Sequence, residues 1–66
     1  MKSNREYKKL TQKKYELITR LTEWTDKLKK AERQKDHQKV KQIENTIKQL
    51  EENLIEVLKQ IEELRK

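Results

Sequence analysis

The apolar residues of this chain form two ladders that mirror each other about a point between residues 35 and 36. In each ladder they recur at alternating steps of 3 and 4, the spacing that places side chains on one face of an α-helix. Paired positions add to 71, so Leu28 faces Ile43 and Leu21 faces Leu50 if the chain folds back on itself. The pattern therefore predicts an all-α fold, an antiparallel two-helix coiled-coil hairpin. Its predicted contact stripe, here called the seam, contains Leu17, Leu21, Trp24, Leu28, Ile43, Ile47, Leu50 and Leu54.

The segment between the ladders favours a turn over one continuous helix. The heptad a positions run 7, 14, 21, 28 and then 40, so the last step is five residues longer than a heptad. Coiled coils tolerate insertions of 3 or 4 residues, because these return the stripe to the same face. We therefore expect a single domain, 1–66, with helices at about 4–34 and 37–65 and a turn at about 35–36. An uninterrupted straight helix is the alternative.

Two cap signals flank the predicted helices. Ser3 and Glu6 have the spacing of a capping box, in which each side chain satisfies a free backbone N–H of the other residue. Asp36 stands just before the second ladder, where its carboxylate can accept from the first N–H groups of a helix and lie at the positive end of the dipole. We expect Asp36 to be the N-cap of the second helix.

The composition agrees with a nearly all-helical chain. Of 66 residues 45% are charged, and none is Gly, Pro or Cys, so the residues that favour turns and bends are missing. A chain of this length with one seam buries little apolar surface. We therefore expect self-association or a partner to supply further stability.

One flank of the seam carries apolar residues in excess of the heptad pattern. With residues 7 and 40 as a positions, two of them lie at e positions and two at b positions, toward the open end of the hairpin. We call this set the apolar patch: Tyr15, Ile18, Ile55 and Leu58. It predicts a second contact surface, either with another copy, which would give a homodimeric four-helix bundle, or with a different protein. Alternatively, it widens the seam to the stripe of an ordinary amphipathic helix.

The opposite flank is basic. Its g positions include Lys13, Arg20, Lys27 and Lys39, here called the basic edge. Residues 1–35 contain 12 Lys and Arg against 5 Asp and Glu, a net charge of +7, whereas residues 36–66 have a net charge of −1. A basic helix of this length could track the phosphates of a nucleic acid. Equally, lysines are good helix formers that keep a helix face in water.

Candidate chemistry is sparse, and we expect no enzymatic activity, metal, cofactor or small-molecule ligand. His37 stands without a second His or a Cys at ligand spacing, which favours a solvated turn residue. There is no Gly-rich phosphate loop and no Ser/His/Asp set. No apolar run exceeds two residues, so neither a membrane span nor a signal-peptide core is expected. Together with the absence of Cys, this favours a cytoplasmic protein.

These features predict a small non-catalytic protein–protein interaction module. Its composition is rich in Lys, Ile, Glu and Asn, which is typical of proteins from AT-rich genomes. This suggests a phage or mobile-element regulator or inhibitor that binds a host protein. As a hairpin of two heptad helices that dimerises, the chain also resembles the plasmid copy-number regulator Rop in architecture and length. That resemblance implies the alternative function, a basic helical hairpin that binds RNA or DNA. No RNA-contacting position is carried over to this sequence.

Overall fold

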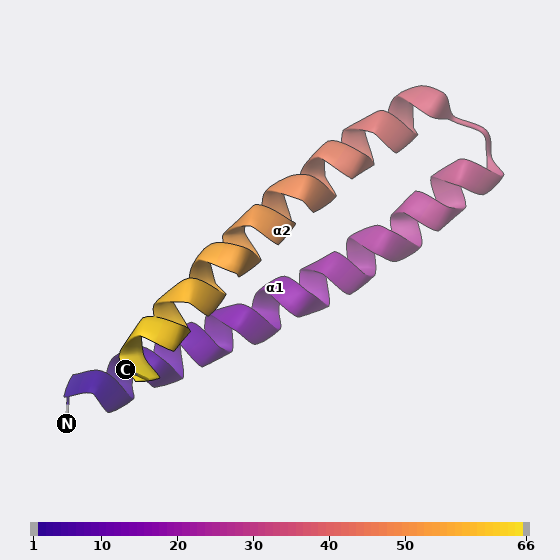
Figure 1. Ribbon diagram of the computed structural model, residues 1–66. Helices are drawn as coiled ribbons and strands as arrows, with labels where there is room; N and C mark the ends of the chain where they lie inside the picture. Colours follow the sequence, from indigo (N-terminus) through magenta and orange to yellow (C-terminus); the bar gives the residue numbers. More distant parts are fainter. Residues whose placement is uncertain (1, 66) are drawn as a thin grey trace.

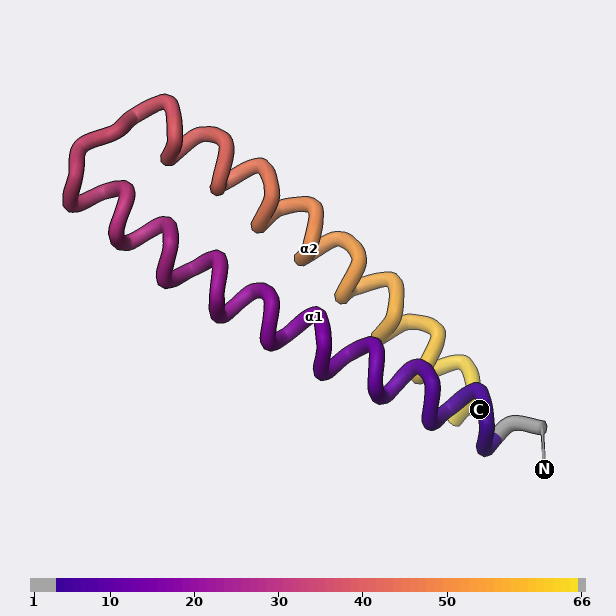
Figure 2. The backbone as a smooth tube through the Cα atoms, turned by 180° about the vertical axis from the view of Figure 1, so that it is seen from behind, coloured from indigo at the N-terminus to yellow at the C-terminus, as the bar shows by residue number. Residues whose placement is uncertain are grey.

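The computed structural model describes residues 2–65, and side chains from residue 4 onward. Two helices, α1 (Lys2–Arg33) and α2 (His37–Arg65), run in opposite directions and pack against each other along most of their length (Figure 1). The described ends of the chain lie together at one end of the molecule, and the turn lies at the other (Figure 2). The predicted helical hairpin is thus confirmed, and the continuous helix is excluded.

The helix ends lie close to the predicted positions. α1 starts at Lys2, before the expected residue 4, and ends at Arg33, whereas α2 covers His37–Arg65. Shifts of this size are common at helix ends, where each further residue adds or removes few contacts. Ser3 falls inside α1, and its side chain lies outside the described residues, so the expected capping box is not described.

The turn closes α1 with a Schellman motif that contains no glycine. The N–H of Asp36 donates to the carbonyl of Ala31 at 3.2 Å, and the N–H of Lys35 donates to the carbonyl of Glu32 at 3.1 Å. These are the two hydrogen bonds of that motif, with Lys35 at the left-handed position. Lys35 has φ = 57°, a region in which the Cβ of an L-residue crowds the backbone.

Asp36 both ends the turn and begins α2. Its Oδ1 accepts a hydrogen bond from the N–H of Lys39 at 3.2 Å, and its carbonyl accepts from the N–H of Val40 at 3.0 Å. The first bond satisfies a backbone donor that a helix start leaves free, and the second is the first regular hydrogen bond of α2, so the expected N-cap is confirmed. Asp36 therefore takes part in both the last backbone hydrogen bond of α1 and the first backbone hydrogen bond of α2. The connection between the helices is short for this reason.

Replacing Lys35 with glycine should stabilise the hairpin. Glycine has no Cβ and adopts the left-handed conformation without strain, so we expect a gain of about 0.5–1 kcal/mol, reduced by the greater freedom of glycine in the unfolded chain. The measurement is the midpoint of thermal unfolding by circular dichroism. Lys35→Ala is the matched control, since it removes the same side chain but keeps the Cβ. An equal gain from alanine would contradict the backbone explanation.

The core lies off the centre of the seam. Of the six buried residues among those described, five occupy d positions, Leu17, Ala31, Ile43, Leu50 and Val57, and the sixth is Ile61 at an a position. Of the other apolar a positions, Tyr7 is exposed and the rest, such as Leu21 and Leu54, are half-buried. On a helix an a position lies beside e, whereas d lies beside g. The d positions therefore supply most of the core, while three others of them, Leu10, Trp24 and Leu64, are half-buried like the a positions.

The molecule is a thin rod with a large surface for its mass. Its extents are 51 × 14 × 11 Å and its radius of gyration is 15.2 Å. It exposes 6007 Å². A folded monomer of this mass usually exposes about 4500 Å² and has a radius of gyration near 11 Å. An elongated hairpin thus retains about 1500 Å² of surface that a globular chain of this size would bury.

Candidate interaction surfaces

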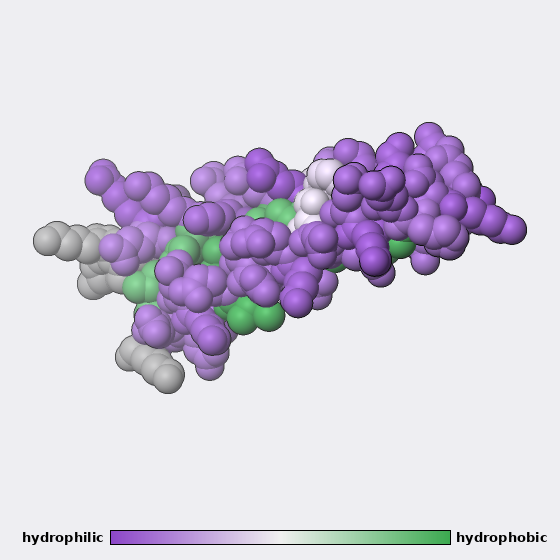
Figure 3. Space-filling view, turned by 90° about the horizontal axis from the view of Figure 1, so that it is seen from above, coloured by the Kyte–Doolittle hydropathy of each residue, from purple (hydrophilic) through white to green (hydrophobic). Residues whose placement is uncertain are grey.

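The apolar patch is exposed. Its four residues, Tyr15, Ile18, Ile55 and Leu58, keep between 41% and 60% of their surface in solvent. Apolar surface gathers in the half of the molecule nearer the chain ends, whereas the half nearer the turn is almost entirely hydrophilic on this face (Figure 3). Isolated exposed apolar residues are normal in proteins, but a contiguous group is typical of a contact surface.

The patch continues the open side of the seam. Leu58 lines a groove together with Tyr7, Thr11 and Lys14, so the e side of α2 faces the a and e positions of α1. Tyr7 is itself 37% exposed. The a positions next to the patch, Lys14, Leu21 and Leu54, are half-buried. Thr11, Lys14, Glu62 and Arg65 line the groove as well, so the surface available for a further contact is apolar with a polar border.

Lys14 takes the one polar position in the α1 ladder and turns toward the patch. Its side chain is half-buried, and its ammonium lies 4.9 Å from the centroid of the Tyr15 ring. The methylenes of a lysine can cover apolar surface while the charge stays in water. At an exposed site the contact between the cation and the ring contributes only about 0.5–1 kcal/mol. Lys14 thus places one positive charge at the border of the apolar patch.

The basic edge is divided into two unlike parts. Toward the open end, Lys13 and Arg20 line a groove that also contains the carboxylates of Glu16 and Glu56. Near the turn, Lys27 and Lys39 line a different groove. The four predicted residues thus form two separate pairs, one in each groove. They do not form one continuous basic stripe along the hairpin. Positive charge is balanced locally at the first groove and accumulates at the second.

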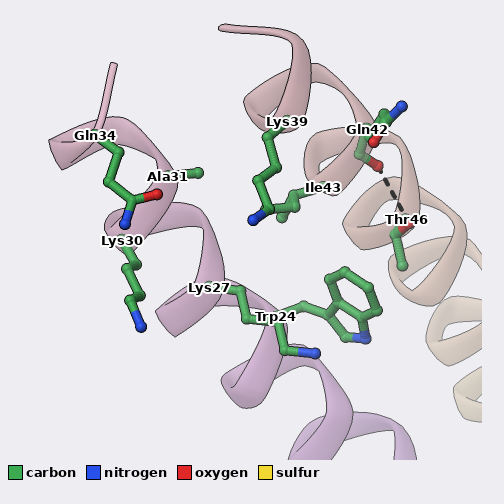
Figure 4. Close-up of a pocket in the computed structure, with 9 residues that line it drawn as sticks. All are labelled: Trp24, Lys27, Lys30, Ala31, Gln34, Lys39, Gln42, Ile43 and Thr46. Carbon is green, nitrogen blue, oxygen red and sulfur yellow. Dashed lines mark hydrogen bonds between the residues drawn. The ribbon is translucent and has the colours of Figure 1, made fainter. Parts of the chain in front are cut away.

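The groove near the turn, here called the cationic groove, lies between the last turns of α1 and the first turns of α2 (Figure 4). Its volume is about 620 Å³. Among the described residues that line it there are three lysines and no Asp or Glu: Trp24, Lys27, Lys30, Ala31, Gln34, Lys39, Gln42, Ile43 and Thr46. In Figure 4 the Trp24 indole reaches from α1 toward α2, and Lys39 reaches from α2 toward α1.

The floor and the rim of the cationic groove differ in polarity. Ala31 and Ile43 are buried, with 2% and 5% of their surface exposed, and provide an apolar floor. The ammonium of Lys27 lies 4.3 Å from the centroid of the Trp24 ring, so a charge covers one face of the indole. Thr46 donates a hydrogen bond to the carbonyl of Gln42 at 3.2 Å, which occupies its hydroxyl proton within α2.

Sequence reasoning found Lys27 and Lys39 but missed the three long polar residues beside them. Lys30 and Gln42 occupy c positions, and Gln34 is a g position at the end of α1. A c position lies next to g on the helix surface and so belongs to the flank on which d is buried. Including the c positions of both helices would have identified the groove from the heptad labels alone.

The described part of the chain shows neither a metal site nor a membrane span. Within residues 2–65, no group of three or more His, Cys, Asp and Glu side chains is arranged to hold a metal ion. Over the same range neither helix has a stretch that is both long and apolar enough to cross a membrane. Compared with known protein families, curated proteins and solved structures, the chain matches none of them significantly.

Proposed function

We propose that this protein is a non-catalytic interaction module that self-associates through the apolar patch and acts by binding other proteins. The observation that carries the proposal is the exposure of the apolar patch, in which Ile18 and Leu58 lie beside half-buried seam residues such as Leu21 and Leu54. A second hairpin laid on this surface would give a four-helix bundle, in which the a positions of all helices face one core.

The exposed area is sufficient for such a contact. A standard interface removes about 800 Å² from each partner, which is less than the excess of about 1500 Å² that this rod exposes over a globular chain. An antiparallel hairpin also presents the same surface on each copy, as a two-fold symmetric contact requires. A dimer would cover the exposed apolar residues and supply stability that a single seam provides poorly.

Sedimentation velocity tests the proposal directly. We expect the sedimentation coefficient of the purified protein to rise from that of a monomer to that of a dimer between about 1 and 300 μM, because oligomer content follows protomer concentration. Addition of salt should change this transition little, since the contact is apolar. A species that stays monomeric over this range would contradict self-association and leave a different protein as the occupant of the patch.

In this proposal the protein is a regulator or inhibitor, of phage or mobile-element type, that occupies a surface of a host protein. Its small size and lack of catalytic groups suit a protein that acts by occupying a site. Rod-shaped helical hairpins present long continuous faces, which favours contact with a groove or helix of a larger protein.

Nucleic-acid binding is the second candidate, and the net charge of +6 together with the basic edge favours it. If the edge contacts phosphates, the affinity for duplex DNA or structured RNA should fall at least tenfold between about 50 and 200 mM salt, because counterions are released on binding. Fluorescence anisotropy with labelled duplexes and hairpins measures this change. Absence of binding at the lower salt concentration would exclude the second candidate.

A further inference from the structure

We propose that the cationic groove near the turn binds an acidic amphipathic helix of a partner protein. The groove lies on the flank opposite the apolar patch, since Ile18 and Lys27 are nine residues apart on α1, which corresponds to half a turn beyond two full turns. Occupation of one surface therefore leaves the other free. The inference stands apart from self-association and can fail or hold independently of it.

The charge of the groove determines the charge of its ligand. Lys27, Lys30 and Lys39 surround it without a carboxylate among the described lining residues, whereas the neighbouring groove on the same flank contains Glu16 and Glu56. Binding of an anion lowers the electrostatic repulsion among the three lysines, and a positive patch attracts negatively charged partners. Carboxylates of a partner fit this rim.

The apolar floor indicates that the ligand has apolar side chains as well as charges. Ala31 and Ile43 lie at the bottom of the groove, and the Trp24 indole forms part of its wall. The lining runs from Trp24 on α1 to Gln34 just after the end of α1, about 15 Å at 1.5 Å per residue, which matches roughly three turns of a helix. A third helix placed between two packed helices would direct its apolar face to this floor and its acidic flanks to the lysines.

A nucleic acid fits the same groove less well. Lys27 already covers one face of the Trp24 ring, so that face is not available for base stacking. The positive charge also does not continue along the flank, because the adjacent groove is lined by two glutamates as well as by Lys13 and Arg20. A phosphate backbone would therefore find three lysines over a short distance rather than a continuous track.

Trp24 is the only Trp in the sequence and lines the groove, so its fluorescence reports on occupancy of this site. The probe is a Trp-free peptide of about 14 residues, with leucine at a and d, glutamate at e and g, and alanine elsewhere. We expect a saturable change in Trp24 emission, because glutamates bound beside the Lys27 ammonium change the electrostatic environment of the indole. The matched peptide with lysine in place of glutamate should give no change.

The variant Lys30→Glu/Lys39→Glu should raise the half-saturating peptide concentration about tenfold at low salt, since it reverses two rim charges. Lys29→Glu/Lys41→Glu is the matched control, because it makes the same change in net charge at exposed b positions of the same helix turns. It should weaken binding less than threefold. If the reversed variant loses helicity by circular dichroism, Lys30→Gln/Lys39→Gln replaces it and should still weaken binding about threefold.

Four results would overturn the proposal. Equal weakening by both charge-reversal pairs would indicate general electrostatic attraction rather than the groove. Equal emission changes with the acidic and basic peptides would show that charge does not select the ligand. A response to single-stranded oligothymidine in place of the acidic peptide would identify a nucleic-acid site. Concentration-dependent emission of the protein alone, removed by Lys30→Glu/Lys39→Glu, would identify a second copy as the occupant.

Discussion

Replacing Leu50 with alanine is expected to cost about 2–4 kcal/mol of folding free energy. Leu50 lies in the core with 9% of its surface exposed, packed in a cluster with Leu17, Val57 and Ile61. Removing its side chain leaves a cavity that two straight helices cannot close without losing other seam contacts. At about 0.05–0.15 kcal/mol per residue, a chain of 66 residues has a total stability of about 3–10 kcal/mol, so this loss is a large fraction of it.

The effect is measured as the midpoint of thermal or urea unfolding followed by circular dichroism. We expect the midpoint to fall by at least about 10 °C, or the variant to be largely unfolded at room temperature. Leu21→Ala is the matched control, because it removes the same atoms from an a position that is only half-buried. It should cost clearly less, about 1–2 kcal/mol. Equal losses of folding free energy in the two variants would show that Leu21 is buried in solution by a further contact besides α2.

The difference in burial between Leu50 and Leu21 could not be predicted from the sequence. The heptad pattern placed both residues in the seam, and the sum of 71 paired them across the hairpin. Heptad labels treat a and d as equivalent, however, and do not give the rotation of each helix about its own axis. In the structure five d positions, Leu50 among them, are buried, whereas a positions such as Leu21 stay half-buried.

The turn was predictable in place but not in geometry. The absence of apolar residues between Ala31 and Val40 located it, and Asp36 was recognisable as an N-cap from its carboxylate. A left-handed residue is usually signalled by glycine or asparagine. Here Lys35 takes that conformation without any local sequence signal, because the two hydrogen bonds of the Schellman motif and the packing of two long helices hold it there.

The exposed residues of each surface were predictable from the sequence, but the way they group into grooves was not. The apolar patch followed from four positions outside the a and d pattern, and all four are exposed. The basic edge looked continuous in sequence because only g positions were compared. Neighbouring c positions decide its character, since Glu16 and Glu56 neutralise one part and Lys30 strengthens the other. Such differences depend on which residues of the second helix lie opposite, and therefore on the exact register.

Ile18→Asp combined with Leu58→Asp is expected to convert a dimer into a monomer. If these exposed residues contact a second copy, the substitution places two unpaired carboxylates in an apolar interface. The free energy needed to remove them from water exceeds the free energy gained from the contact. We expect the dimer dissociation constant to rise at least about a hundredfold, measured by sedimentation velocity or light scattering. Helicity should fall as well, because an isolated two-helix seam is only marginally stable.

The matched control is Gln12→Asp with Asn45→Asp, which adds the same two aspartates at exposed f positions that face away from both flanks. It should leave the dimer intact. Ile18→Gln with Leu58→Gln removes the apolar surface without adding charge, and it separates loss of association from loss of folding if the aspartate variant unfolds. A dimer that survives both patch variants unchanged would place the self-contact on another face. A wild-type protein that is already monomeric would assign the patch to a different protein, and the same variants should then abolish binding to that partner.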